Sequence, residues 1–156
     1  MTNRSGNELL QEVHHPLLAQ KTVRLLISRE DLQHPQISGN KWYKLKYNIA
    51  LAKAIGVHRL LSFGGAYSNH LHALAYAGHL HGVETVGLVR GELIEPLNAT
   101  LRDAVDWGMK LVAVPRAAYR LRHDINAMKR FVAPFQPCMV IPEHGADRLA
   151  ARRGAE

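Results

Sequence analysis

The stretch LLSFGGAYSNHLHALA, residues 60–75, runs from an apolar segment through paired glycines into a segment with helical spacing. It predicts a strand, a tight turn and a helix, in that order. Gly64 and Gly65 permit backbone torsions and a close ligand approach that side chains would block, and Ser68 or Asn69 can cap the helix. Amides at the start of this helix would point at a bound carboxylate or phosphate. A turn of this kind is also common as a purely structural feature.

Outward from this stretch, short apolar strands alternate with amphipathic helices. The predicted strands cover residues 22–31, 58–63, 84–89, 109–114 and 137–142. The predicted helices cover residues 41–56, 68–82, 98–108 and 118–132. Continuous apolar strands separated by amphipathic helices are typical of a parallel sheet covered on both faces. The sequence therefore predicts an α/β fold, with an open parallel sheet of about four strands and helices on both faces.

Composition favours one globular domain with a real core. The chain has 156 residues, of which 47% are hydrophobic and 21% are charged. A net charge of +7 means that an anionic partner must be considered. The basic residues are scattered and are not interleaved with aromatic ones, which argues against a nucleic-acid partner.

The single cysteine and the N-terminal sequence bear on the cellular compartment. Cys138 lies among apolar residues, where a small buried hydrophobe is favoured over a nucleophile, and it excludes an internal disulfide. The N-terminus lacks the apolar run of a secretory signal, and no stretch is long enough to span a bilayer. We therefore expect a cytoplasmic protein with no membrane partner.

The lysine-rich stretch SGNKWYKLKYN, residues 38–48, opens the first predicted helix. Lys41 and Lys44 lie three residues apart, so their ammonium groups would repel each other on one helical face. Such a pair is either solvated at the surface or takes part in chemistry.

Four of the ten histidines cluster in the helix that follows the glycines. These are His70, His72, His79 and His81. A metal site would usually add a carboxylate or a thiolate, which this stretch lacks. We therefore predict no metal site and expect solvated histidines on the helix surface.

The lysine stretch and the glycine turn together resemble one family of pyridoxal 5′-phosphate enzymes. This family includes 1-aminocyclopropane-1-carboxylate deaminase and D-cysteine desulfhydrase and has the tryptophan synthase β-like fold (fold type II). SREDL (28–32), VRGE (89–92) and VIPEHGADRLAARRGAE (140–156) are also similar to stretches of the family. The resemblance runs from about residue 10 to the end and corresponds to the N-terminal portion of these enzymes.

The resemblance implies a role for each matched residue. Lys41 would bond covalently to pyridoxal 5′-phosphate and later move a proton of the substrate. Lys44 would lower the pKa of Lys41 and face the cofactor phosphate. Ser68 would act in catalysis and contact the substrate carboxylate, Asn69 would bind the cofactor ring oxygen and the substrate, and His70 would touch the carboxylate.

The resemblance also implies a division of the chain. Residues 41–142 would form the small α/β domain of the tryptophan synthase β-like fold. Residues 1–40 would pack on a larger domain that the chain does not contain, and residues 143–156 would begin that domain.

The activity implied is that of a deaminase or desulfhydrase of small amino acids, such as D-cysteine or 1-aminocyclopropane-1-carboxylate. Because the family's phosphate-binding loop has no counterpart in the sequence, we expect this chain alone to be weak or inactive. Two alternatives stay open: a non-catalytic α/β binding module, or one half of a split enzyme. A companion chain would then supply the larger domain, and a homo-oligomer is a further possible assembly.

Overall fold

The computed structural model describes residues 9–32, 34, 36–37 and 41–143. Its centre is a four-stranded sheet in the order β5–β4–β3–β6, in which every neighbouring pair is parallel. The strands are β3 (Arg59–Gly64), β4 (Glu84–Arg90), β5 (Lys110–Val114) and β6 (Met139–Ile141). The predicted open parallel sheet of about four strands is confirmed.

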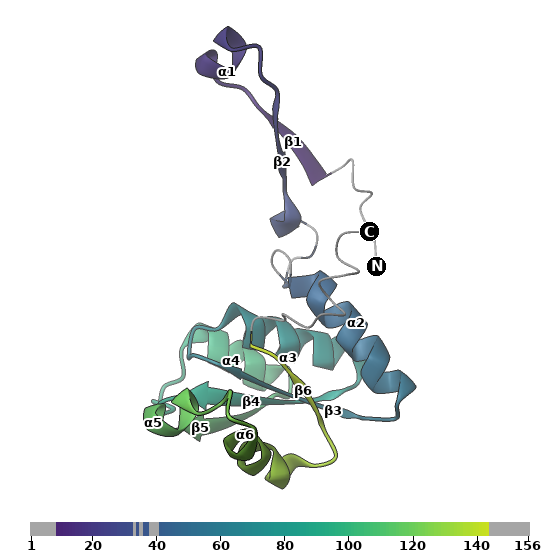
Figure 1. Cartoon of the computed structure of the whole chain (residues 1–156), viewed down its shortest axis with the longest axis vertical. Coiled ribbons are helices and arrows are strands. Elements are labelled where there is room, and N and C mark those ends of the chain that lie inside the picture. The colour runs from purple at the N-terminus through teal and green to yellow at the C-terminus, as the bar shows by residue number, and fades with distance from the viewer. Residues whose placement is uncertain (1–8, 33, 35, 38–40, 144–156) are drawn as a thin grey trace.

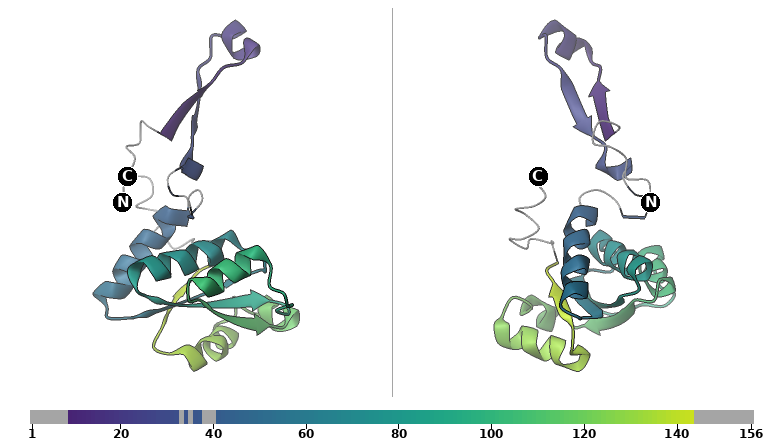
Figure 2. Two further views of the ribbon diagram at one scale, coloured as in Figure 1. Left: turned by 180° about the vertical axis from the view of Figure 1, so that it is seen from behind. Right: turned by 90° about the vertical axis from the view of Figure 1, so that its right-hand side faces the viewer.

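Helices cover both faces of this sheet (Figures 1 and 2). One face carries α2 (Lys41–Ala54), α3 (Asn69–His81) and α4 (Ala99–Asp106); the other carries α5 (Arg116–Arg120), α6 (Ile125–Val132) and the short 3₁₀ helix η3 (Ala133–Phe135). α2 ends at Ala54, two residues before the predicted end, and Gly56 follows it with a φ of +70° that other residues rarely reach. The predicted α/β fold with helices on both faces is confirmed.

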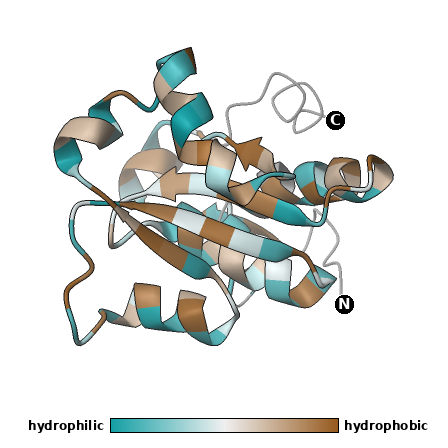
Figure 3. Ribbon diagram, turned by 90° about the horizontal axis from the view of Figure 1, so that it is seen from below, coloured by the Kyte–Doolittle hydropathy of each residue, from teal (hydrophilic) through white to brown (hydrophobic). Residues whose placement is uncertain are grey.

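Each face of the sheet has its own apolar core. Leu60 joins the cluster beneath α2, α3 and α4, whereas Leu61 joins the cluster against α5 and α6, because successive strand residues point to opposite faces. The strands are largely apolar along their length, and the surrounding helices alternate polar and apolar stretches (Figure 3). Cys138 packs half-buried against the second cluster, and burial raises the pKa of its thiol.

The prediction of one helix over residues 118–132 is wrong, because two helices occupy this segment. α5 ends at Arg120, and α6 begins afresh at Ile125. Asp124 causes the new start, since its carboxylate accepts a hydrogen bond of 2.8 Å from the amide of Ala127. An aspartate that caps a helix N-terminus cannot also lie in the middle of a continuous helix.

The segment before α2 forms an arm that projects from the body (Figures 1 and 2). The arm, residues 9–32, consists of β1 (Leu10–Val13), α1 (Pro16–Gln20), β2 (Leu25–Ser28) and the 3₁₀ turn η2 (Glu30–Leu32). β1 and β2 pair antiparallel. The strand predicted at 22–31 is thus present in a shorter form, and its partner β1 was not predicted.

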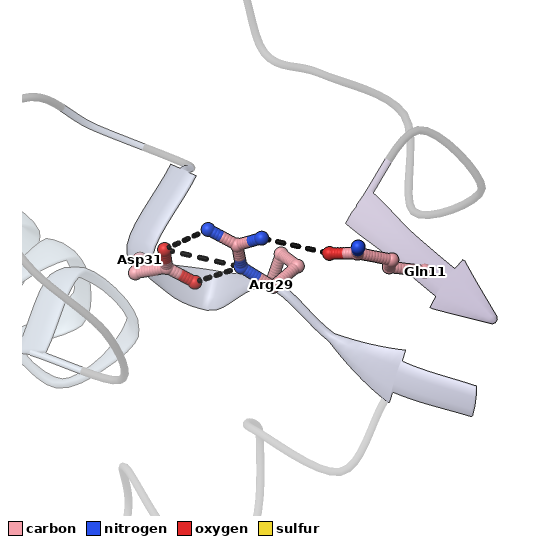
Figure 4. A network of polar contacts seen from close by, with 3 residues as sticks. All are labelled: Gln11, Arg29 and Asp31. Atoms are coloured by element: carbon pink, nitrogen blue, oxygen red, sulfur yellow. Dashed lines mark hydrogen bonds and ion pairs between the residues drawn. The ribbon is translucent and has the colours of Figure 1, made fainter. Parts of the chain in front are cut away.

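Polar contacts close the base of the arm (Figure 4). The guanidinium of Arg29 donates to the Asp31 carboxylate at 2.7 and 2.9 Å and to the Gln11 side-chain oxygen at 2.7 Å. The Arg29 amide also donates to the Leu9 carbonyl at 2.8 Å. Two residues of the SREDL stretch therefore hold the arm's own structure together.

None of the helices in the described ranges is both long enough and apolar enough to cross a membrane.

Candidate functional site

The path of the chain through the sheet reverses direction at β3, which makes a topological switch point. The chain passes from β3 to β4 and β5 on one side, then crosses back to β6 on the other side of β3. The helices that follow β3 and precede β6 lie on opposite faces. Ligands of open α/β sheets bind at such a switch point, beyond the carboxyl ends of the strands. Here that edge holds Gly64, where β3 ends, and Glu143, which follows β6.

The turn after β3 requires glycine at its first position. A Cβ on Gly64 would lie 2.6 Å from the Ser68 hydroxyl oxygen and 2.7 Å from Leu71 Cγ. Of the two candidate caps, Ser68 is the one used, and its hydroxyl oxygen accepts a hydrogen bond of 3.2 Å from the Leu71 amide. Asn69 is the first residue of α3 and is exposed. The turn therefore presents Ser68 and Asn69 together at the carboxyl edge.

Asn98 fixes this turn from the neighbouring loop. Its amide nitrogen donates to the Ala66 carbonyl at 3.0 Å, and its oxygen accepts from the Leu101 amide at 3.1 Å. One side chain thus caps α4 and holds the glycine turn. Sequence reasoning did not find this role, because the two loops are far apart in the chain.

Lys41 lies at the same edge of the sheet as the glycine turn. α2 is joined to the start of β3 by residues 55–58 alone, so α2 must begin near the opposite, carboxyl end of the sheet. α3 runs in the same direction and packs against α2. Lys41 is half-buried at the first position of α2. The side chain of Lys44 lies outside the described residues, so its role beside Lys41 stays a prediction.

His70 is buried beneath the turn. Its ring Nε2 lies 2.9 Å from the Ser62 hydroxyl oxygen, and that hydroxyl donates to the Ile141 carbonyl at 2.6 Å. A hydroxyl has one hydrogen, so Nε2–H of His70 is the donor in the first contact. The pair ties the first turn of α3 to β3 and β6. A contact between His70 and a substrate carboxylate stays a prediction.

The expectation of solvated histidines is wrong for His70. Only His79 of the four is exposed, since His72 and His81 are half-buried. His70 is only 4% exposed. His72 is half-buried, with Nε2 3.2 Å from an Asp103 carboxylate oxygen and its ring 4.7 Å from that of Trp107. The reason is that α3 lies between α2 and α4, which leaves little of its surface free. Within the described ranges, no group of three possible ligands is placed to hold a metal ion.

A second polar cluster lies near the carboxyl edge on the other face of the sheet. Tyr119 is 2% exposed, with the Arg122 guanidinium 4.6 Å and that of Arg90 5.9 Å from its ring centroid. Arg122 also donates to Glu143 at 2.8 Å. Burial raises the pKa of Tyr119, and the Glu143 carboxylate adds to the rise. The phenol is therefore neutral, and sequence reasoning gave it no role.

The fold and this edge define an open α/β domain whose candidate site lies at the switch point between β3 and β6. The fold matches the crystal structure of a protein described as an ACC deaminase homologue. The TM-score is 0.69 and the sequence identity 22%, over 90% of this chain and 43% of that chain. This likeness establishes the fold.

Nocardicin C-9′ epimerase of Nocardia uniformis subsp. tsuyamanensis is 33% identical over 141 residues. The aligned region is 87% of this chain and 43% of the epimerase. No family model matches the chain. The chain thus spans less than half the length of either matched protein.

Proposed function

We propose that the chain forms the small α/β domain of a pyridoxal phosphate-dependent enzyme that acts on small amino acids, as a deaminase or a desulfhydrase. The main support is that α2 and α3 begin at the same edge of the sheet, with Lys41 opening one and Asn69 opening the other. The fold match to the ACC deaminase homologue supports the same assignment. A lysine, a serine hydroxyl and an asparagine amide at one edge suit a cofactor that needs an amine, a donor and an orienting hydrogen bond.

The chemical groups and the open backbone at this edge are of the type that the cofactor needs. At Gly64 only bare backbone can approach Ser68, since a Cβ would lie 2.6 Å from its hydroxyl oxygen. At Gly65 a Cβ would meet just one group of the described residues within 4 Å, a nitrogen of Arg90 at 3.7 Å. Ser68 and Leu71 thus fill the space at Gly64, whereas Gly65 leaves open space beside the turn, which suits the approach of a flat ring. Pyridoxal phosphate, when bound, supplies an electron sink that stabilises negative charge next to the substrate amine.

Each residue of the proposed site would have its own role. The Lys41 amine would hold the cofactor covalently and then move a proton at the substrate carbon. The Ser68 oxygen already accepts from the Leu71 amide, so its hydrogen is directed elsewhere and would donate to the substrate carboxylate. Asn69 is exposed at the edge and would donate to the cofactor ring oxygen. His70 and Ser62 would hold this turn of α3 in place from below.

The substrate is proposed as a small D-amino acid or a cyclopropane amino acid. A deaminase, a desulfhydrase and an epimerase all need a base placed against the carbon that reacts, and Lys41 is proposed as that base. Deuterium exchange at the α-carbon of D-cysteine separates simple proton transfer from elimination, which releases a 2-oxo acid. 1-Aminocyclopropane-1-carboxylate has no α-hydrogen, so for this compound release of the 2-oxo acid is the measurement. D-cysteine and 1-aminocyclopropane-1-carboxylate are the first compounds to compare.

Attachment of the cofactor tests the proposal before turnover does, because the chain spans 43% of the length of both matched proteins. The purified chain is titrated with pyridoxal phosphate, reduced with borohydride and digested for peptide mapping. We expect the label on Lys41, lost in Lys41→Ala. Lys46→Ala is the matched control, since Lys46 is an exposed lysine on the same helix.

Two results would count against the proposal. One is scattered labelling that Lys41→Ala leaves unchanged. The other is labelling that falls equally in Lys41→Ala and Lys46→Ala. Either would favour the alternative of a non-catalytic α/β module that keeps the fold without the cofactor.

A further inference from the structure

An open pocket of about 610 Å³ lies at the carboxyl ends of β4 and β5, beside the turn that follows β3. A volume of this size suits a metabolite-sized ligand. Its lining includes Ala66, Arg90, Glu92, Ile94, Pro115 and Arg116. Two arginines from two adjacent strand ends thus line one pocket with mixed apolar walls.

Arg90, the last residue of β4, is held against fixed groups. Its guanidinium carbon lies 5.9 Å from the ring centroid of Tyr119, which is buried and provides a rigid platform. On its other side, a Cβ on Gly65 would lie 3.7 Å from a terminal nitrogen of Arg90. The arginine therefore spans from the glycine turn to α5.

The Arg116 side chain lies close to the backbone of Gly91. The Gly91 amide donates to the Val114 carbonyl at 2.8 Å, which joins the ends of β4 and β5. Gly91 has a φ of +92°, and a Cβ there would lie 3.5 Å from Nε of Arg116. The same hydrogen bond therefore brings Arg90 and Arg116 to a single pocket.

Neither arginine has an acidic partner in the described part of the chain, where the side chains of Arg90 and Arg116 make no hydrogen bond or ion pair. Other arginines do have acidic partners, such as Arg59 with Glu84 at 2.7 Å. Two guanidinium groups that face one pocket repel each other, and a bound oxyanion would relieve that repulsion.

We propose that this pocket binds a compact organic anion with more than one negative charge, held by Arg90 and Arg116. Phosphate monoesters and dicarboxylates share this chemistry, since a guanidinium pairs with either oxyanion in a bidentate manner. The apolar walls, Ala66, Ile94 and Pro115, would contact the carbon part of the ligand. The site does not require Lys41, so it stands or falls apart from the proposed enzymatic function.

Calorimetric titration with inorganic phosphate, succinate and acetate tests the site, at low ionic strength because exposed charges are screened by salt. We expect saturable binding of at least one of the two multivalent anions and weaker binding of acetate. Arg116→Gln and Arg90→Gln should each weaken binding about fivefold or more. Arg102→Gln, which removes an exposed arginine of α4 outside the pocket, should change it by less than about twofold.

Two further variants sharpen the result. Glu92→Gln should tighten binding, because it removes the acidic side chain of the lining. Lys41→Ala should leave binding unchanged, even if the cofactor experiment fails. The proposal is overturned if no multivalent anion binds saturably, if Arg102→Gln weakens binding as much as Arg116→Gln does, or if Glu92→Gln weakens it.

Discussion

Strands β2 and β3 have nearly the same sequence and opposite environments. β2 reads LLIS at residues 25–28, and its two leucines and isoleucine are 45–47% exposed. β3 contains LLSF at residues 60–63, where every residue is buried and both leucines are completely so. Apolar composition alone therefore predicts that both segments are strands, and neighbouring elements decide which of them is buried.

The difference lies in what covers each strand. β3 pairs with β4 and β6 and has helices on both faces. β2 pairs only with β1 among the described strands, and a two-stranded ribbon is marginal by itself in water. The arm should therefore contribute little to the stability of the body, and substitutions in the two regions test this contrast.

Truncation of a buried leucine in the body should have the largest effect. Leu74 of α3 is fully buried in the cluster with α2 and α4. Leu74→Ala should lower the free energy of unfolding by about 2–5 kcal/mol, because it removes buried apolar surface and leaves a cavity. Urea denaturation followed by circular dichroism measures the change. A loss below about 0.5 kcal/mol would show that this face of the sheet is not packed as described.

The buried polar link at the switch point should come next. Ser62→Ala leaves Nε2–H of His70 and the Ile141 carbonyl without their hydroxyl partner, which should cost about 1–3 kcal/mol. A double-mutant cycle with His70→Leu measures the coupling. The double variant should be more stable than the sum of the single changes predicts, because both polar partners are then gone. Strict additivity would contradict the link.

The cap of α6 should have a smaller effect. Asp124→Ala removes the 2.8 Å hydrogen bond to the Ala127 amide and should lower stability by about 1 kcal/mol. Asp106→Ala is the matched control, since this exposed aspartate ends α4 and caps no helix. Equal losses from the two variants would mean that α5 and α6 do not depend on Asp124 for their separation.

The fold could be predicted from sequence further than the site could. The four parallel strands follow from local apolar runs, since a strand buried on both faces needs no alternation. β1 was missed because it is a strand only through its pairing with β2, which lies further along the chain. The break before α6 was missed because a cap and a helix-interior aspartate look alike in sequence.

The site was harder to predict from sequence, because its residues come together from distant parts of the chain. Gly64, Ser68 and Asn69 lie within six residues of one another, so their turn can be recognised from sequence. Arg90 and Arg116 meet only because β4 and β5 are adjacent, in a register that sets Arg90 opposite Val114. His70 is buried because α3 lies between two other helices, and no local pattern shows which face they cover.

The stability of the chain should depend on pH through His34, which lies in the sequence between the arm and α2. Its Nδ1 accepts hydrogen bonds from the amides of Gln36 and Ile37 at 3.1 and 3.2 Å. Its ring is 5.2 Å from that of Tyr76. Burial lowers the pKa of His34. The folded chain then binds this proton less readily than the unfolded chain, so stability should fall as pH drops through the ordinary range of histidine and level off below the folded-state pKa.

Ring-proton NMR tests this sign directly, with His34→Gln used to assign the resonance. The titration midpoint of His34 in the folded chain should lie below its midpoint in urea. A midpoint at or above the urea value would contradict the predicted loss of stability as pH falls.

A substitution in the arm should have the smallest effect on stability. Leu26 is 45% exposed, so Leu26→Ala should change the free energy of unfolding by less than about 0.5 kcal/mol. Amides of β2 should also exchange with deuterium much faster than those of β3, since few buried contacts protect them. If Leu26→Ala instead cost as much as Leu74→Ala, the arm would have to be covered in solution. Gel filtration over a range of concentrations would then separate self-association, which depends on concentration, from cover by the chain itself, which does not.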